Sequence, residues 1–163
     1  MMKDQGEPHQ REVKSKQKTA LITAVDYLAR QAHSEKKLRE KLERKGFSEE
    51  EIDAAIARLI QRHYLDDREL CMQQFMYLYN ESRSSVRQIY IKLIQRGFDK
   101  DLIRSVIPDD TREREIAAAK RVLTLKFKPS AQPQKMMANL YQKGFSVDVA
   151  RAAVRYYAES EEE

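Results

Sequence analysis

A glycine followed by phenylalanine recurs three times in this 163-residue chain and fixes the register of an internal repeat. A leucine stands four residues before each glycine, and a residue able to cap a helix stands two residues after it. The three pairs are Gly46-Phe47, Gly97-Phe98 and Gly144-Phe145. The glycines are 51 and 47 residues apart, a spacing typical of helical repeat units, so the sequence predicts three tandem copies.

The first copy shows how each unit is built. Ser34 is placed to cap a helix that carries Leu38 and Leu42 on one stripe and ends at Gly46. Ser48, three residues before a glutamate, forms the signature of a capping box that opens a third helix over residues 49–62. The buried face of that helix is predicted to comprise Ile52, Ala55, Ile56 and Leu59.

A first helix should begin near Thr19 and bury one face against the other two. The residues on that face are Leu21, Ala24, Val25 and Leu28. The second copy carries Met72, Phe75, Met76 and Tyr79 at the same positions. The third copy matches this pattern less well, because Lys126 stands at the last of these positions. We expect the side chain of Phe127 to fill the place of the missing apolar residue.

The predicted fold is therefore all-α, with three tandem three-helix repeat units forming an elongated, curved molecule. The predicted parts are a flexible N-terminal arm (1–17), repeat units over 18–64, 65–109 and 110–158, the last divergent, and an acidic tail (159–163). The 35% charged residues and four glycines suit small helical units better than one broad sheet.

Several classes of protein are disfavoured by what the sequence lacks. No apolar run approaches the roughly 18 residues of a membrane span, and no signal-peptide core is visible, so we expect a cytoplasmic protein without membrane contact. No glycine-rich phosphate loop, nucleophile elbow or metal-ligand spacing appears, which predicts no enzyme, no cofactor and no metal. The single cysteine, Cys71, is interpreted as a small apolar helix residue rather than a reactive thiol.

Basic residues gather on and around the second helices of the first two copies, although the net charge is only +5. The candidate partner-binding residues are Lys37, Lys41, Arg44, Lys45, Arg83, Arg87, Lys92 and Arg96. Their charges would meet phosphate or carboxylate groups. Any single one of these residues is more simply interpreted as a solvated surface charge without a partner. Because two copies carry the same sign of charge at this place, that interpretation is weaker for the whole set.

The segment between the first two copies is the predicted structural joint. It comprises Tyr64, Leu65, Asp66 and Asp67. Tyr64 and Leu65 are expected to act as apolar plugs between neighbouring units. Asp66, three residues before Glu69, is expected to cap the next helix. The joint between the second and third copies lacks this sequence.

These motifs resemble the RecX family of bacterial recombination regulators. The resemblance rests on HSEKKLREKL, GFSEEEID and RLIQRHYLDDREL in the first copy and on SSVRQIYIKLIQRGFDKDLI in the second. It implies tandem three-helix units that bind the RecA–DNA filament and limit its growth and ATP hydrolysis, without catalysis of their own. The implied partners are the RecA filament and, as a further option, single- or double-stranded DNA itself. We expect a monomer.

Two other functions are consistent with the pattern. A stand-alone DNA-binding protein would use the three-helix units as helix-turn-helix readers. The third helices begin SEEEID and DKDLI, which is acidic where a recognition helix would approach phosphate and counts against this reading. An inert helical scaffold would be indifferent to Lys37→Glu combined with Lys41→Glu, whereas the other two functions predict an effect on DNA-linked activity.

Overall fold

The computed structural model describes residues 17–160, and within this part of the chain it contains nine helices and no strand. The helices are α1 (Ala20–Arg30), α2 (Glu35–Arg44), α3 (Glu49–Gln61), α4 (Asp67–Glu81), α5 (Val86–Gln95), α6 (Lys100–Val106), α7 (Arg112–Lys126), α8 (Pro133–Gln142) and α9 (Val147–Glu159). The predicted arm and acidic tail lie mostly outside the described residues.

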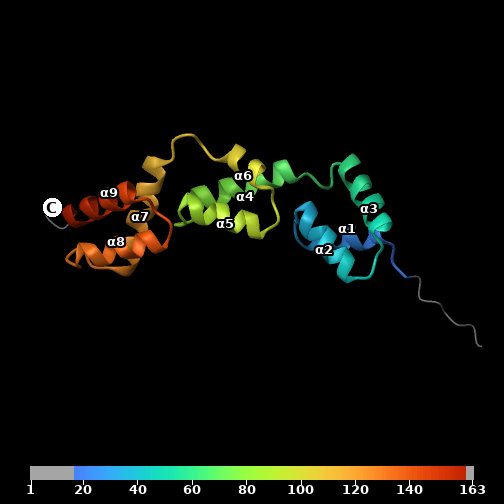
Figure 1. Cartoon of the computed structure of the whole chain (residues 1–163), viewed down its shortest axis with the longest axis horizontal. Coiled ribbons are helices and arrows are strands. Elements are labelled where there is room, and N and C mark those ends of the chain that lie inside the picture. Colours follow the sequence, from blue (N-terminus) through green and yellow to red (C-terminus); the bar gives the residue numbers. More distant parts are fainter. Residues whose placement is uncertain (1–16, 161–163) are drawn as a thin grey trace, which may run out of the picture.

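The helices form three units of three, which follow one another along the longest axis of the molecule (Figure 1). Each unit has its own hydrophobic cluster, centred on Leu38 and Leu42 in the first, Phe75 and Leu93 in the second, and Leu123 in the third. The helices that pack closely against each other belong to the same unit. The predicted all-α fold of three tandem units in an elongated, gently curved row is confirmed.

Serine hydroxyls begin four of the helices by accepting a backbone N–H of the first turn. Ser34, Ser48, Ser85 and Ser146 occupy these N-cap positions. At Ser48 the predicted capping box is present: the hydroxyl accepts the N–H of Glu51 at 3.2 Å, and the Glu51 carboxylate accepts the N–H of Ser48 at 2.8 Å. Local sequence thus sets where the helices begin.

The three repeat glycines end α2, α5 and α8 in the left-handed region, with φ of +91°, +91° and +86°. The phenylalanine after each glycine donates its N–H to the carbonyl of the leucine five residues earlier, as Phe98 does to Leu93 at 3.2 Å. This is the Schellman arrangement, in which glycine avoids the steric cost that a Cβ would impose. The repeat signature therefore encodes a helix end.

The predicted buried face of the first helices is partly wrong. Met72 and Met76 are 49% and 45% exposed, and Val25 is 46% exposed. The buried stripe of α4 consists of Cys71, Phe75 and Leu78 instead. The stripe is thus rotated by about one residue, or roughly 100° around the helix, which turns the flanking side chains toward solvent.

In the third unit, the predicted replacement of Lys126 by Phe127 is confirmed. Lys126 is exposed, and Phe127 packs against the hydrophobic cluster of that unit. The main-chain oxygen of Phe127 also accepts a hydrogen bond from the Tyr157 hydroxyl at 2.5 Å, which ties the end of α7 to α9. The divergent copy therefore keeps its core by shifting the apolar contact one residue along the chain.

The buried thiol of Cys71 should react slowly with alkylating agents. Burial, with a smaller contribution from Asp67, raises its pKa to about 11. Because the thiolate is the reactive form, we expect the native protein at pH 8 to react about 100-fold more slowly than free cysteine. The same protein unfolded in guanidinium is the control. Equal rates in the native and unfolded protein would contradict the structure.

Candidate partner-binding surface

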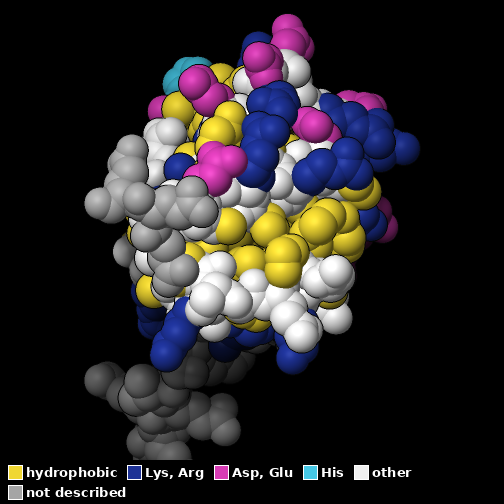
Figure 2. Space-filling model, turned by 90° about the vertical axis from the view of Figure 1, so that its left-hand side faces the viewer, with side chains coloured by type: hydrophobic (Ala, Val, Ile, Leu, Met, Phe, Trp, Pro, Cys, Tyr) yellow, Lys and Arg dark blue, Asp and Glu magenta, His cyan; other side chains and the backbone are white. Residues whose placement is uncertain are grey.

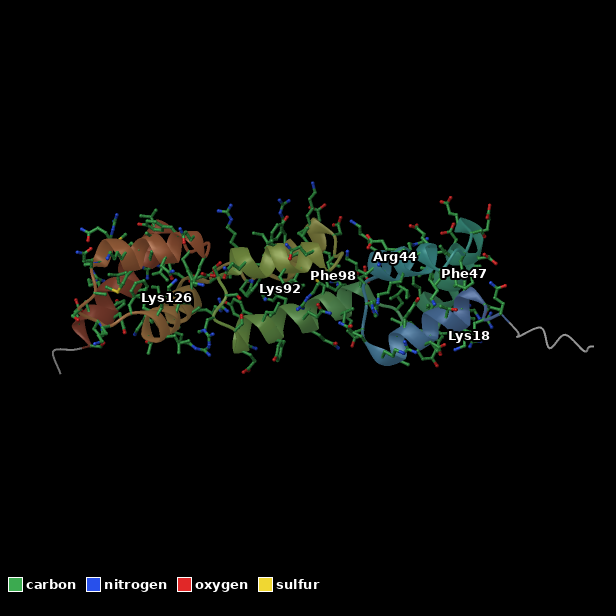
Figure 3. All side chains as sticks on the ribbon, turned by 90° about the horizontal axis from the view of Figure 1, so that it is seen from below. Lys18, Arg44, Phe47, Lys92, Phe98 and Lys126 are labelled. Atoms are coloured by element: carbon green, nitrogen blue, oxygen red, sulfur yellow. The ribbon has the colours of Figure 1, made fainter. Side chains whose placement is uncertain are left out.

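The second helices of the three units lie end to end. The Ser34 hydroxyl at the start of α2 donates to the carbonyl of Arg96 at the end of α5, at 2.6 Å. The Ser85 hydroxyl at the start of α5 donates to the carbonyl of Lys143 at the end of α8, also at 2.6 Å. The three helices therefore run in one direction as an interrupted row, α8 to α5 to α2, seen from below in Figure 3.

Each joint in this row also contains a carboxylate. Asp67 accepts the N–H of Glu35 at 2.9 Å in the first joint, and Glu115 accepts the N–H of Val86 at 2.5 Å in the second. Burial raises the pKa of both carboxyl groups above their ordinary values, although the hydrogen bonds that they accept oppose the shift. In both joints, a serine hydroxyl thus donates to a carbonyl at the end of one helix of the row, and a carboxylate accepts an N–H at the start of the next helix.

The second joint has an additional clamp. The Arg114 guanidinium donates to four main-chain carbonyls at the end of α4 and just beyond it. These are the carbonyls of Leu78 (3.3 Å), Tyr79 (2.8 Å), Ser82 (3.2 Å) and Ser84 (2.5 Å). The guanidinium also lies 4.7 Å from the centre of the Tyr79 ring. Asp67 occupies the repeat position of Arg114 in the second unit, so the first joint is built without this arginine.

Several of the predicted basic residues lie at the two joints. The side-chain stem of Lys37 lies beside the Gly97 turn, close to Arg96. The stem of Arg87 lies beside the Gly144 turn. Arg83 lines a hollow of about 370 Å³ next to this second joint. Basic side chains thus recur where one unit meets the next.

The candidate side chains differ in how they are engaged. Lys37 donates to Glu40 at 3.1 Å, and the Lys41 ammonium lies 5.1 Å from the Tyr27 ring centre. Arg96 is exposed and donates to the side chain of Gln74 at 2.8 Å.

The remaining candidates complete the set. Arg44, at 74% exposure, lies 4.0 Å from Glu40. Lys45, Arg83 and Arg87 are exposed, and Lys92 is half-buried. Figure 3 shows Arg44 and Lys92 on their respective helices. The exposed charges at the joints and helix ends are therefore the better candidates for contact with a partner.

The predicted joint segment has mixed outcomes. Leu65 is 5% exposed and packs into the core of the first unit, whereas Tyr64 is 68% exposed and is not a plug. The Tyr64 main chain donates to Leu59, which closes the end of α3 and directs the ring outward. Asp66 caps α4 as predicted, accepting the N–H of Glu69 at 3.1 Å. The contact of Asp67 with α2 was not predicted.

Sequence reasoning missed further residues at the joints. Lys143 precedes the third repeat glycine as Lys45 and Arg96 precede the others, so the repeat register could have identified it. Arg114 and Glu115 gave no such signal, because their role depends on how the second and third units dock. The missed residues hold the units together and add basic charge at the second joint.

The end of the molecule formed by the third unit differs from the joints. Figure 2 shows a band of hydrophobic side chains across this face, with both basic and acidic side chains above it and lysines or arginines below it. The exposed large apolar side chains of the unit are Leu125, Tyr141, Val147 and Tyr156. This face therefore combines exposed apolar side chains with charged ones.

Over residues 17–160 the structure shows no group of three histidine, cysteine, aspartate or glutamate side chains able to hold a metal ion. None of the helices in this part of the chain is long and apolar enough to cross a membrane.

Comparison with known proteins places the chain in a family. Residues 20–59 match a family model described as RecX, first three-helix domain. The Regulatory protein RecX of Caldanaerobacter subterraneus is 31% identical over 132 residues, which cover 80% of this chain and 66% of that protein. The Regulatory protein RecX of Chlorobaculum tepidum is 31% identical over 145 residues, which cover 86% of this chain and 89% of that protein.

The fold leads to the same relatives. The crystal structure of RecX from Lactobacillus salivarius superposes with a TM-score of 0.74 at 19% identity, covering 85% of this chain and 94% of that chain. At this identity the likeness concerns the fold alone. With the sequence matches, which reach across most of the described units, it leads to one conclusion: the chain belongs to the RecX family of regulatory proteins.

Proposed function

We propose that this protein is a non-enzymatic regulator that binds the RecA–DNA filament and restrains its growth and ATP hydrolysis. The observation that carries the proposal is the end-to-end row of α8, α5 and α2, with exposed basic residues at each joint. An elongated molecule with repeated contact points suits a partner that is itself a repeating polymer. Its basic charges suit the phosphates or acidic side chains that such a filament presents.

A stand-alone DNA reader is supported less well. A recognition helix would present donors at its N-terminus to base edges and phosphates. The third helix of the first unit instead presents Glu49, Glu50 and Glu51, all exposed, at that end. Their charge would repel the DNA backbone. The family membership and the acidic helix starts therefore favour a protein–DNA filament over free duplex DNA as the partner.

The proposal predicts that charge reversal at the two ends of α5 weakens inhibition of the recombinase. Arg87 and Arg96 are exposed and lie one at each joint. We expect Arg87→Glu with Arg96→Glu to raise by about tenfold the concentration that halves ATP hydrolysis by the cognate RecA on single-stranded DNA. Circular dichroism would confirm that the variant keeps its helices.

The matched control is Lys126→Glu with Lys128→Glu, two exposed lysines at and just beyond the end of α7 that line none of the hollows at the two joints. This variant changes the net charge equally and should inhibit like the natural protein. Inhibition by the natural protein far below an equimolar ratio to RecA would support an action on filament growth. Inhibition only when the DNA is covered would indicate competition for the strand, and none at any ratio would refute the proposal.

A further inference from the structure

Within the part of the chain that the structure describes, no neighbouring unit covers the repeat glycine turn of the first unit, whereas each of the other two turns is covered by one. A Cβ built on Gly97 would lie 2.6 Å from the Ser34 hydroxyl, and one on Gly144 would lie 2.9 Å from the Ser85 hydroxyl. A Cβ built on Gly46 would have no neighbour within 4 Å among the described residues. Phe47 is correspondingly half-buried, while the equivalent phenylalanines of the other units are 4% exposed.

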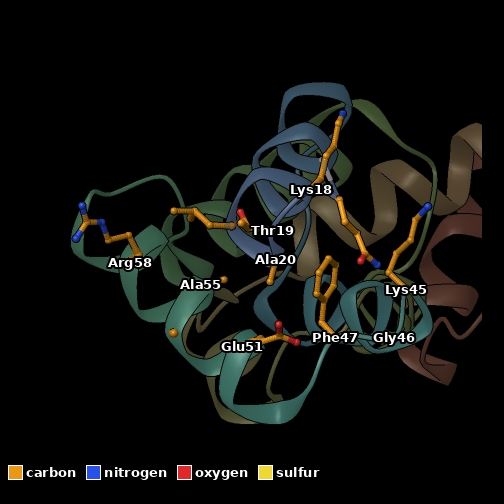
Figure 4. A pocket seen from close by; sticks show the side chains of 12 residues that line it. Lys18, Thr19, Ala20, Lys45, Gly46, Phe47, Glu51, Ala55 and Arg58 are labelled. Atoms are coloured by element: carbon orange, nitrogen blue, oxygen red, sulfur yellow. The ribbon is translucent and has the colours of Figure 1, made fainter. Parts of the chain in front are cut away.

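A hollow of about 760 Å³ lies beside this turn (Figure 4). Its apolar surface includes Phe47, Ala20 and Ala55. Figure 4 shows the Phe47 ring in the middle of the site, with Lys45 on one side and Arg58 on the other. The hollow therefore combines an apolar floor with a basic rim.

The hollow exists because α1 begins later than its counterparts. α1 starts at Ala20, which stands at the repeat position of Cys71, whereas α4 starts four residues earlier at Asp67. Leu70, at the end of this extra turn, packs against the cluster that contains Phe98. The exposed Thr19 takes its repeat position in the first unit. Among residues 17–60, the first unit thus has no counterpart of the apolar side chain that Leu70 supplies in the second unit.

The third unit has a similar arrangement, displaced by one residue, because Ile116 stands one position before the repeat counterpart of Leu70. α7 also begins early, and Ile116 belongs to the same buried cluster as Phe145. In both units the turn that precedes this apolar residue is acidic. The acids are Asp67 and Glu69 before Leu70, and Glu113 and Glu115 before Ile116. In two units of this chain, an apolar residue preceded by acids therefore packs into the cluster that contains this phenylalanine.

The charges around the open hollow match such an occupant. The described residues that line it include Lys18, Lys45 and Arg58 and, among them, one acid, Glu51. The Glu51 carboxylate already accepts the N–H of Ser48, and Lys18 pairs with Asp26 at 2.7 Å. The local charge is thus net positive, so an acidic segment would be attracted to it.

We propose that this hollow binds an acidic segment of a partner protein in which a leucine or isoleucine follows two acids, as in the first turn of α4. The apolar side chain lies on Phe47, and the carboxylates face Lys45 and Arg58. The proposal does not depend on the proposed action on RecA: the hollow lies at the end of the first unit away from both joints, and of the candidate partner-binding residues only Lys45 is among the described residues that line it.

The test uses the full chain and a fluorescein-labelled peptide that copies residues 66–74 with Cys71→Ser. Fluorescence polarisation should show saturable binding. Arg58→Glu should weaken the affinity at least tenfold, and so should replacement of the leucine of the peptide by serine. Arg62→Glu, an exposed charge change just after the end of the same helix, should leave the affinity within twofold.

Arg58→Gln, a milder change, guards against a folding defect in the charge reversal and should weaken binding at least threefold. The proposal is overturned by the absence of saturable binding up to about 1 mM peptide, the weakest affinity of practical interest. It is also overturned if Arg62→Glu weakens binding as much as Arg58→Glu. A chain without residues 1–16 that binds the peptide tenfold more tightly would identify its own N-terminal segment as the occupant, against a partner protein.

Discussion

Replacing Arg114 with alanine should lower the free energy of unfolding of the second and third units by about 3–5 kcal/mol. The guanidinium donates to four carbonyls and is only 15% exposed, so its removal leaves several buried acceptors without a donor. It also removes the neutralising charge 3.8 Å from the buried Glu115 carboxylate. Guanidinium titration followed by circular dichroism would measure the loss.

Arg112 on the same helix provides the matched control. Its ion pair with Asp148 is shorter, at 3.0 Å, but the two side chains are 57% and 70% exposed. An exposed pair contributes at most about 1 kcal/mol, so Arg112→Ala should be close to neutral. Arg114→Lys should fall between the two, because an ammonium cannot reach four carbonyls at once. A loss below 1 kcal/mol for Arg114→Ala would refute the clamp.

The contrast between these two arginines shows where sequence reasoning stops. The Gly-Phe repeat, the serine caps and the leucine stripes act within a few residues of one another, so they predicted the helices and the three units. Arg114 acts on carbonyls some thirty residues earlier in the chain, at positions that only the docking of two units brings near. No local pattern marks it, and its repeat counterpart is an aspartate.

The candidate surface was predictable to a similar extent. Composition identified the basic residues, and the repeat register could have added Lys143. The sequence could not show that Lys37 pairs with Glu40 or that Lys41 lies over the Tyr27 ring. It also could not show that basic charges gather at the joints. Exposure also depends on helix rotation, which the mixed apolar pattern of α4 left ambiguous by one residue. Met72 and Met76 were misplaced for this reason.

Gly97→Ala should loosen the first joint, and Gly46→Ala should not. Both glycines have φ of +91°, so alanine at either position costs about 1–2 kcal/mol of backbone strain. Only at Gly97 does the new Cβ meet the Ser34 hydroxyl, at 2.6 Å. The serine must move, and its hydrogen bond to Arg96 is lost. We expect a further loss of about 1–3 kcal/mol from Gly97→Ala.

Spin labels on exposed positions of the first and second units would separate strain from uncoupling. Glu50→Cys and Arg104→Cys place labels on α3 and α6, and the buried Cys71 should remain unlabelled. Gly97→Ala should broaden the distance distribution between the labels, whereas Gly46→Ala should leave its width unchanged. Identical distributions in the two variants would mean that the serine contact does not hold the joint.

The second joint should respond less to the same change. A Cβ on Gly144 would lie 2.9 Å from the Ser85 hydroxyl, but Arg114 clamps the two units independently of that serine. Gly144→Ala should therefore strain the turn while the second and third units stay docked. Combining it with Arg114→Ala should broaden their separation as Gly97→Ala does at the first joint. If Gly144→Ala alone separated them, the serine contact and not the arginine would hold both joints.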